Sequence, residues 1–99
     1  MTIRKTHENG IITLFVEGRL DIKTSPEFQN VLIPSFDEAK EVIVDFTDLT
    51  RLYTDGLRVL LIAQKEANKK GATMKVANVS KSVMQVLVMT NFTNILTII

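Results

Sequence analysis

Two strand-like patterns open the chain, at residues 3–7 and 11–16, and the second is an almost continuous apolar run. Glu8-Asn9-Gly10 lies between them, and Asn-Gly favours a tight hairpin because both residues tolerate a positive φ. The pattern therefore predicts an N-terminal β-hairpin. Its second strand is expected to be central in a sheet and covered on both faces or nearly so, because its apolar residues hardly alternate with polar ones.

After the hairpin, helical and strand periods alternate along the chain. A first helix is expected from Ser25, with Phe28, Val31 and Leu32 on its buried face and Pro34 ending or kinking it. The later elements are a strand at 41–46, a helix at about 55–70, a strand at 72–78, a helix at about 81–90 and an apolar tail at 95–99 that can add an edge strand. This order predicts an α/β fold in one domain, 1–99, with a mixed sheet of four to five strands: an N-terminal β-hairpin, then alternating helices and parallel strands.

Residues that favour helix ends mark several of these boundaries. Ser25 and Ser80 are expected to cap the first and last helices. Gly71 is expected to close the second helix, and Asn91 to close the last one, in the left-handed region of backbone conformation.

The central helix carries apolar residues on more than one side. The stripe expected to face the sheet consists of Leu57, Leu60, Leu61, Gln64 and Ala67. Val59 and Ile62 are then expected to point largely away, where exposed apolar residues beside a functional turn can dock a partner. The alternatives are that the last helix or a loop covers them, or that they are single exposures. On the last helix, Met84 and Met89 are expected to fill the core.

Composition narrows the function classes. The net charge of +1 gives no electrostatic reason to expect nucleic-acid binding, and the absence of cysteine removes disulfide and thiolate chemistry. No apolar run approaches the roughly 20 residues that span a bilayer, and the N-terminus has no apolar signal core, so a cytoplasmic protein is expected. No Gly-rich nucleotide loop or metal-ligand cluster is present, so no cofactor and no metal are expected. Asp45, Asp48 and Asp55 form no paired acid–base signature, so the chain is not expected to be an enzyme.

The turn Tyr53-Thr54-Asp55-Gly56 carries the candidate chemistry, because it places a hydroxyl where the central helix begins. Free backbone N–H groups and the positive end of the helix dipole can stabilise a phosphate there. Thr54 is therefore a candidate phosphorylation site. The alternative is that Thr54 and Asp55 simply cap the helix. Tyr53 can either contact a partner or cover the helix start.

Several stretches together resemble the STAS domain, and within it the small single-domain anti-sigma factor antagonists. They are Val16-Glu-Gly-Arg-Leu-Asp21 followed by Thr24, the strand Val42-Ile-Val-Asp45, Gly56-Leu57 followed by Leu60-Leu61, and Gly71 with Met74-Lys-Val-Ala-Asn78. Their order and gapless spacing cover almost the whole chain. The family's turn usually reads Asp-Ser-Ser-Gly, and Thr54 falls on its phosphorylated hydroxyl. Tyr53 and Asp55 depart from the pattern, because they stand where the family has its aspartate and its second serine.

The resemblance implies a regulatory protein that binds an anti-sigma factor with serine/threonine kinase activity, with ATP held by that partner. The loop of Asp21 and Thr24 lies near the phosphorylation turn in the resembled family. The residues expected to bind the partner are Asp21, Thr24, Tyr53, Thr54, Asp55, Gly56, Arg58 and Ile62. The alternative is a non-phosphorylated STAS adaptor that docks on an ATPase of a lipid-transport or signalling complex, which the unusual Tyr53 keeps open.

Overall fold

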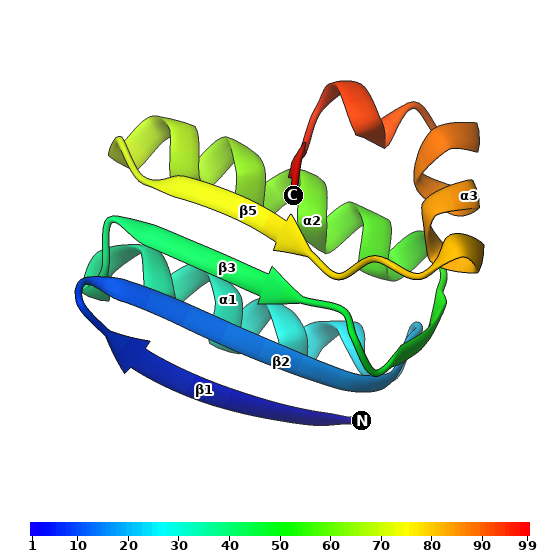
Figure 1. Cartoon of the computed structure of the whole chain (residues 1–99), viewed down its shortest axis with the longest axis horizontal. Helices are drawn as coiled ribbons and strands as arrows, with labels where there is room; N and C mark the ends of the chain where they lie inside the picture. The colour runs from blue at the N-terminus through cyan, green and yellow to red at the C-terminus, as the bar shows by residue number, and fades with distance from the viewer.

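A mixed β-sheet organises the chain, and two long helices lie on one of its faces (Figure 1). The computed structural model describes residues 1–99. Its elements in chain order are β1 (Thr2–Glu8), β2 (Ile11–Leu20), α1 (Ser25–Glu38), β3 (Glu41–Asp45), β4 (Leu49–Leu52), α2 (Thr54–Lys70), β5 (Thr73–Ala77), α3 (Lys81–Met89), the 3-10 turn η1 (Phe92–Asn94) and β6 (Thr97–Ile98).

The strand order confirms the predicted α/β fold with its N-terminal hairpin. β1 pairs antiparallel with β2, and the sheet continues through β3, β5 and β6 with parallel pairing. β4, which the sequence pattern did not predict, adds a strand that pairs with β2 alone. The apolar tail contributes β6 at the sheet edge, as expected.

β2 changes partner along its length. Residues 11–15 pair with β3, and residues 18–20 pair with β4. The register shifts between Gly18 and Arg19, and Gly18 has a φ of 103°, which only glycine adopts without strain. The second half of β2 is thereby directed toward the segment that precedes α2.

Only one face of the central strand is fully covered. Ile12, Leu14 and Val16 are buried under the helices, whereas Phe15 on the other face is half-buried. The expectation that both faces are covered is wrong, because α1 and α2 lie on the same side of the sheet (Figure 1). On the open face, the Arg4 guanidinium lies 4.1 Å from the centre of the Phe15 ring.

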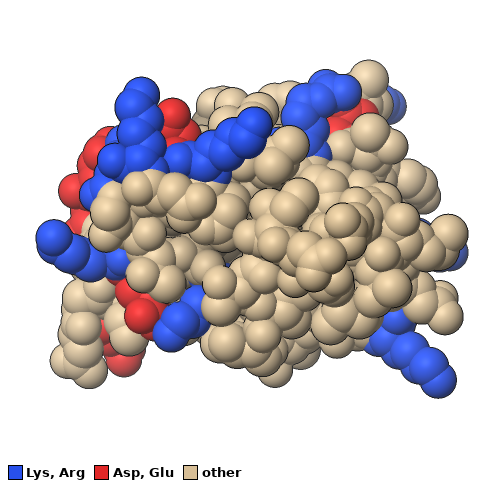
Figure 2. All heavy atoms as spheres, turned by 90° about the horizontal axis from the view of Figure 1, so that it is seen from above, with Lys and Arg blue, Asp and Glu red and all other residues tan.

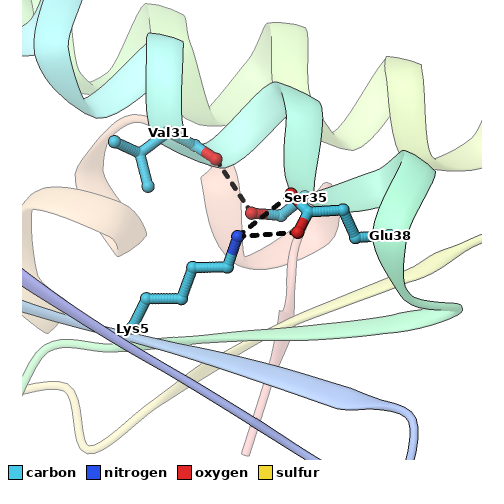
Figure 3. A network of polar contacts seen from close by, with 4 residues as sticks. All are labelled: Lys5, Val31, Ser35 and Glu38. Atoms are coloured by element: carbon cyan, nitrogen blue, oxygen red, sulfur yellow. Dashed lines mark hydrogen bonds and ion pairs between the residues drawn. The ribbon is translucent and has the colours of Figure 1, made fainter.

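α1 continues four residues past Pro34, so of the two expectations for Pro34, an end or a kink of the helix, the end is wrong. Pro34 and Asn30 are both exposed, so water can satisfy the Asn30 carbonyl that proline leaves without a donor. Beyond Pro34, the buried Ser35 Oγ donates to the Val31 carbonyl at 2.8 Å (Figure 3). The Lys5 ammonium of β1 lies 3.0 Å from both carboxylate oxygens of Glu38 and links the hairpin to the last turn of α1 (Figure 3).

α2 buries a wider arc than the expected stripe. Val59, expected to point away, is only 4% exposed, because α1 lies beside α2 and covers this side of the helix. Leu61, expected to face the sheet, and Ile62 are both half-buried. Gly71 closes the helix in the left-handed region with a φ of 70°, as predicted.

The end of the chain differs from expectation in one respect. Ser80 caps α3 by accepting a hydrogen bond from the Val83 N–H at 3.3 Å, and Asn91 is left-handed with a φ of 65°, both as predicted. Met89, however, is 85% exposed and does not fill the core. Its position in the last turn of a nine-residue helix leaves no element above it. None of the helices combines the length and the apolar character needed to cross a membrane.

Candidate functional site

The start of α2 presents an exposed threonine. Thr54 is the first residue of the helix, as predicted, and it is exposed. The N-cap residue is Tyr53, in an extended conformation, and no side chain caps the helix. The expectation that Thr54 only caps the helix is therefore wrong. The backbone N–H groups of this first turn remain available to an added anion.

Two contacts fix this turn against the end of β2. The Tyr53 N–H donates to the Leu20 carbonyl at 2.9 Å. Gly56 packs so closely that an added Cβ would lie 2.8 Å from Leu20 Cβ and from Leu52 Cδ1. Gly56 is buried, so we assign it a packing role: it allows α2 to begin directly on the ends of β2 and β4.

The loop before α1 uses its polar side chains on its own backbone. Asp21 Oδ1 accepts hydrogen bonds from the N–H groups of Lys23 and Thr24, at 2.9 and 3.0 Å. The Thr24 hydroxyl donates to the Arg19 carbonyl at 2.7 Å and accepts from the Asp21 N–H at 2.9 Å. The hydrogen bond from the Thr24 N–H, with those from Lys23 and the Thr24 hydroxyl, holds the pKa of Asp21 below its ordinary value.

Ser25 does not cap α1 as predicted, because it is already inside the helix. Thr24 occupies the N-cap position, with its hydroxyl engaged by Arg19 rather than by the helix. Ser25 is 2% exposed and its hydroxyl has no hydrogen-bond partner. Pro26 follows it in the first turn, as expected for a helix start.

The two helix starts face a shared hollow. Arg19, Asp21, Ile22, Tyr53 and Asp55 surround an open cavity of about 430 Å³. A neighbouring groove of about 360 Å³ separates the first turns of α1 and α2, and it is lined by Ile22, Asp55, Arg58 and five other residues. Asp55 and Arg58 form an ion pair at 3.4 Å across the first turn of α2. Asp21, Tyr53, Asp55 and Arg58 are thus brought together on one surface.

Sequence reasoning missed two residues of this surface, and four of the residues that it included line neither hollow. Ile22 is 72% exposed between the two hollows, and Arg19 lines the first. No sequence signal singles out Ile22, because isolated apolar residues are common on protein surfaces. The four predicted residues that line neither hollow are Thr24, Thr54, Gly56 and Ile62.

Asp45, at the end of β3, has a structural environment. Its carboxylate accepts from the Thr47 N–H at 2.8 Å, the Thr47 hydroxyl at 2.6 Å and the Asn78 amide at 2.8 Å. Burial alone would raise the pKa of Asp45, but these hydrogen bonds outweigh it and hold that pKa below the ordinary value. Asp45 therefore joins the ends of β3 and β5.

Nowhere does the chain bring together three or more His, Asp or Glu side chains that could hold a metal ion.

The order of strands and helices agrees with comparisons to known proteins. The family model for the STAS domain matches residues 2–99, and the chain belongs to this family. The predicted resemblance is thereby confirmed.

Relatives of known type share the fold at low sequence identity. The anti-sigma-B factor antagonist of Bacillus subtilis (strain 168) is 23% identical over 94 residues, which cover 95% of this chain and 85% of that protein. The crystal structure of an anti-sigma factor antagonist from Mycobacterium paratuberculosis has a TM-score of 0.87 at 16% identity and covers 98% of this chain and 83% of that one. The Bacillus cell fate determinant SpoIIAA in its phosphorylated form has a TM-score of 0.75 at 14% identity, covering 99% and 91%. The chain thus has the fold of anti-sigma factor antagonists.

Proposed function

We propose that this protein is an anti-sigma factor antagonist that binds an anti-sigma factor with serine/threonine kinase activity, and that phosphorylation of Thr54 switches this binding off. The main observation in support is that Thr54 is exposed on the first turn of α2, which no side chain caps. The proposal is also supported by the similarity of this chain to an anti-sigma-B factor antagonist and to a phosphorylated SpoIIAA.

The proposed binding surface is formed by the two helix starts. It includes Asp21, Thr24, Tyr53, Thr54, Asp55, Gly56 and Arg58, with Ile62 at its margin and with Arg19 and Ile22 added by the hollows. Tyr53 is 47% exposed and Ile22 is 72% exposed, so they are its apolar contacts. Asp21, Thr24 and Gly56 act through the backbone that they hold in place.

Phosphorylation would change this surface more than it would change the fold. A phosphate adds roughly −1.5 to −2 charges at neutral pH. The N-terminus of α2 favours that charge by about 0.3–1 kcal/mol, so the domain tolerates it. A partner packed over Thr54 would have to bury the charge, and an unpaired buried charge costs several kcal/mol. Loss of binding with an intact fold is the expected result.

Asp55 and Arg58 set the local charge before modification. Their ion pair at 3.4 Å leaves the first turn of α2 without net charge. Arg58 lies four residues after Thr54, which is the spacing at which side chains on one helix face each other. The proposed phosphate therefore has a guanidinium within reach on the same helix, beside the repelling Asp55.

The experiment uses the kinase-type anti-sigma factor encoded by the same organism. Incubation with ATP followed by mass spectrometry should find phosphate on Thr54 and none in Thr54→Ala. In calorimetric titrations, Thr54→Ala should bind like the unmodified protein and Thr54→Glu at least about tenfold more weakly, which is a difference of about 1.4 kcal/mol.

A matched control adds the same negative charge far from the turn. Gln85 is exposed on α3, and Gln85→Glu should leave the affinity for the anti-sigma factor unchanged. Equal binding by Thr54→Ala and Thr54→Glu would contradict the switch. If no kinase-type anti-sigma factor binds but an ATPase of a transport or signalling complex does, the adaptor role replaces the proposed one.

A further inference from the structure

The four arginines of the chain differ in what their guanidinium groups contact. Arg4 lies over an aromatic ring, and Arg58 pairs with a carboxylate. Arg19 and Arg51 do neither: each is exposed, and no acidic group lies within ion-pair distance of it. Two of the four arginines therefore keep an uncompensated charge at the surface.

These two arginines are neighbours on the short ribbon that β2 and β4 form. Arg19 and Arg51 are register partners in the parallel pairing, and paired strands lie about 4.8 Å apart. Leu20 and Leu52, the next pair along the ribbon, are buried, so the arginines point to the opposite, exposed face. Like charges on adjacent strands repel each other, so the fold itself gains nothing from this arrangement.

The groups around the two arginines leave their charges available. The pKa of Asp21 is lowered first by the hydrogen bond from the Thr24 N–H and only last by the charge of Arg19, so its carboxylate is already held by the loop backbone. Arg51 is the one charged residue among the seven that line an open cavity of about 190 Å³ between β4 and α3. Neither guanidinium is therefore neutralised within the chain.

Tyr53 joins the two arginines into one surface. It is 47% exposed and lines both the cavity of Arg51 and the hollow of Arg19. Its N–H donates to the Leu20 carbonyl at 2.9 Å, which fixes it at the end of the ribbon. Arginine and tyrosine are among the residues that most often dominate the binding energy of protein interfaces. We call Arg19, Arg51 and Tyr53 the arginine surface.

We propose that the arginine surface binds an acidic segment of the anti-sigma factor, whose Asp or Glu carboxylates meet the two guanidinium groups. The inference rests on the proposed function and adds the chemistry of the partner's contact. A guanidinium presents parallel N–H donors that match the two oxygens of a carboxylate, and such charge-assisted hydrogen bonds are stronger than neutral ones. Carboxylates bound here would also relieve the repulsion between Arg19 and Arg51.

The surrounding charges favour an acidic protein segment over nucleic acid. Asp21 and Asp55 line the same hollow as Arg19 and would repel a phosphate backbone that continued past the arginines. The net charge of the chain is only +1. On the face seen in Figure 2, several basic side chains lie beside acidic ones at the margins of a broad uncharged area, without a continuous basic stripe. The arginine surface therefore suits a few carboxylates better than a long polyanion.

Calorimetric titration with the anti-sigma factor of the same organism tests the role of Arg51. Arg51→Glu should weaken binding about tenfold or more, and the loss should shrink as salt is added. The matched control is Lys65→Glu, the same change of charge at an exposed position of α2, which should alter the affinity less than about twofold. Both variants should keep the circular dichroism and thermal midpoint of the unmodified protein.

The same variant separates partner binding from a protective role of Arg51. β4 pairs with β2 alone, and a charge on such an edge strand opposes pairing with other chains. That role is served by a charge of either sign, so Arg51→Glu would then bind the anti-sigma factor as the unmodified protein does. Equal binding by Arg51→Glu and Lys65→Glu would overturn the inference and leave the proposed function standing.

A second titration needs no anti-sigma factor. A blocked tetraglutamate peptide is added at low salt, and the NMR signals of the four arginine Nε–H groups are followed. The signals of Arg19 and Arg51 should shift, whereas those of Arg4 and Arg58, which have partners within the chain, should not. A thymidine pentanucleotide of equal charge should shift them less.

The outcomes of the peptide titration are distinct. Equal shifts at all four arginines, or larger shifts with the oligonucleotide, would overturn the preference for acidic protein. A selective response to tetraglutamate, together with no binding of any anti-sigma factor, would contradict the proposed function and support the carboxylate preference of the arginine surface.

Discussion

The two helix starts of this fold contain the same kinds of residue and use them differently. Before α1, Asp21 and Thr24 hydrogen-bond to backbone groups within their own loop. At the start of α2, Thr54 caps nothing, and the Asp55 carboxylate pairs only with the exposed Arg58. The difference arises from the backbone: the first loop folds back on itself, whereas the extended Tyr53 leads straight into α2. The backbone conformation around a threonine and a nearby aspartate thus decides whether the threonine hydroxyl supports the fold or stays exposed without a partner.

The largest loss of stability is expected from a substitution that prevents the start of α2 from packing closely on β2. Gly56→Ala should destabilise the protein by about 2–3 kcal/mol, because the new methyl group would lie 2.8 Å from Leu20 Cβ, an atom that cannot rotate away. This loss should occur even though alanine improves helix propensity by about 1 kcal/mol. Urea unfolding measures it, with Arg58→Ala as an exposed control in the same turn. A neutral or stabilising Gly56→Ala would show that α2 is not fixed on β2.

The hydrogen-bonded carboxylate of Asp45 should make the free energy of unfolding depend on pH. Asp45→Asn should cost about 2 kcal/mol at neutral pH, because a charged acceptor of three hydrogen bonds is lost. The pKa of Asp45 is lowered in the folded state, so its contribution is present above the ordinary value of 3.8 and is lost as the pH falls through the folded-state pKa. The stability gap between Asp45→Asn and the unmodified protein should therefore close in acid. A gap that is constant down to pH 2 would contradict this role.

The comparison is tested most directly by the same substitution at both helix starts. Thr24→Val should destabilise by about 1 kcal/mol, because the Arg19 carbonyl and the Asp21 N–H each lose a partner. Thr54→Val should change the free energy of unfolding by less than about 0.5 kcal/mol, because the exposed hydroxyl supports no part of the fold. Chemical denaturation of the two variants side by side measures the difference, and equal losses would remove the distinction.

The smallest effect on stability is expected for Thr54→Glu, although it should have the largest effect on the proposed partner binding. A negative charge at the N-terminus of α2 should stabilise the fold by a few tenths of a kcal/mol at low salt, and added salt should screen this gain. The thermal midpoint measured at low and high salt gives the size of the effect. A clear destabilisation of the fold would mean that weakened partner binding cannot be assigned to charge alone.

Patterns that depend on neighbouring residues predicted much of the fold. The Asn-Gly hairpin, the left-handed Gly71 and Asn91 and the Ser80 cap all rest on local backbone preferences. The position of Thr54 at a helix start followed from the same kind of signal. These preferences depend only on residues that are close in the chain, so the positions of turns and helix ends can be predicted from a single sequence.

The errors concern contacts between distant segments. Val59 is buried because α1, some thirty residues earlier, lies against α2, and a helical pattern read by itself does not show a second neighbour. β4 has buried leucines only at its two ends, so it lacks the alternation of a strand and forms by pairing with β2. Ile22 and Arg19 join the site for the same reason, since Leu20 brings their loop to Tyr53.

The change of partner along β2 also affects which part of the molecule opens most easily. Residues 11–15 have a strand on each side, β1 and β3, whereas residues 18–20 pair with the four-residue β4 alone. The amide of Tyr53, bonded to the Leu20 carbonyl at that weaker end, should therefore exchange its hydrogen faster than the amide of Leu14 in the middle of the sheet. Local opening of this kind would release the Thr54 turn while the hairpin and the core stay folded, and would let the Thr54 hydroxyl extend further into the active site of the proposed kinase partner.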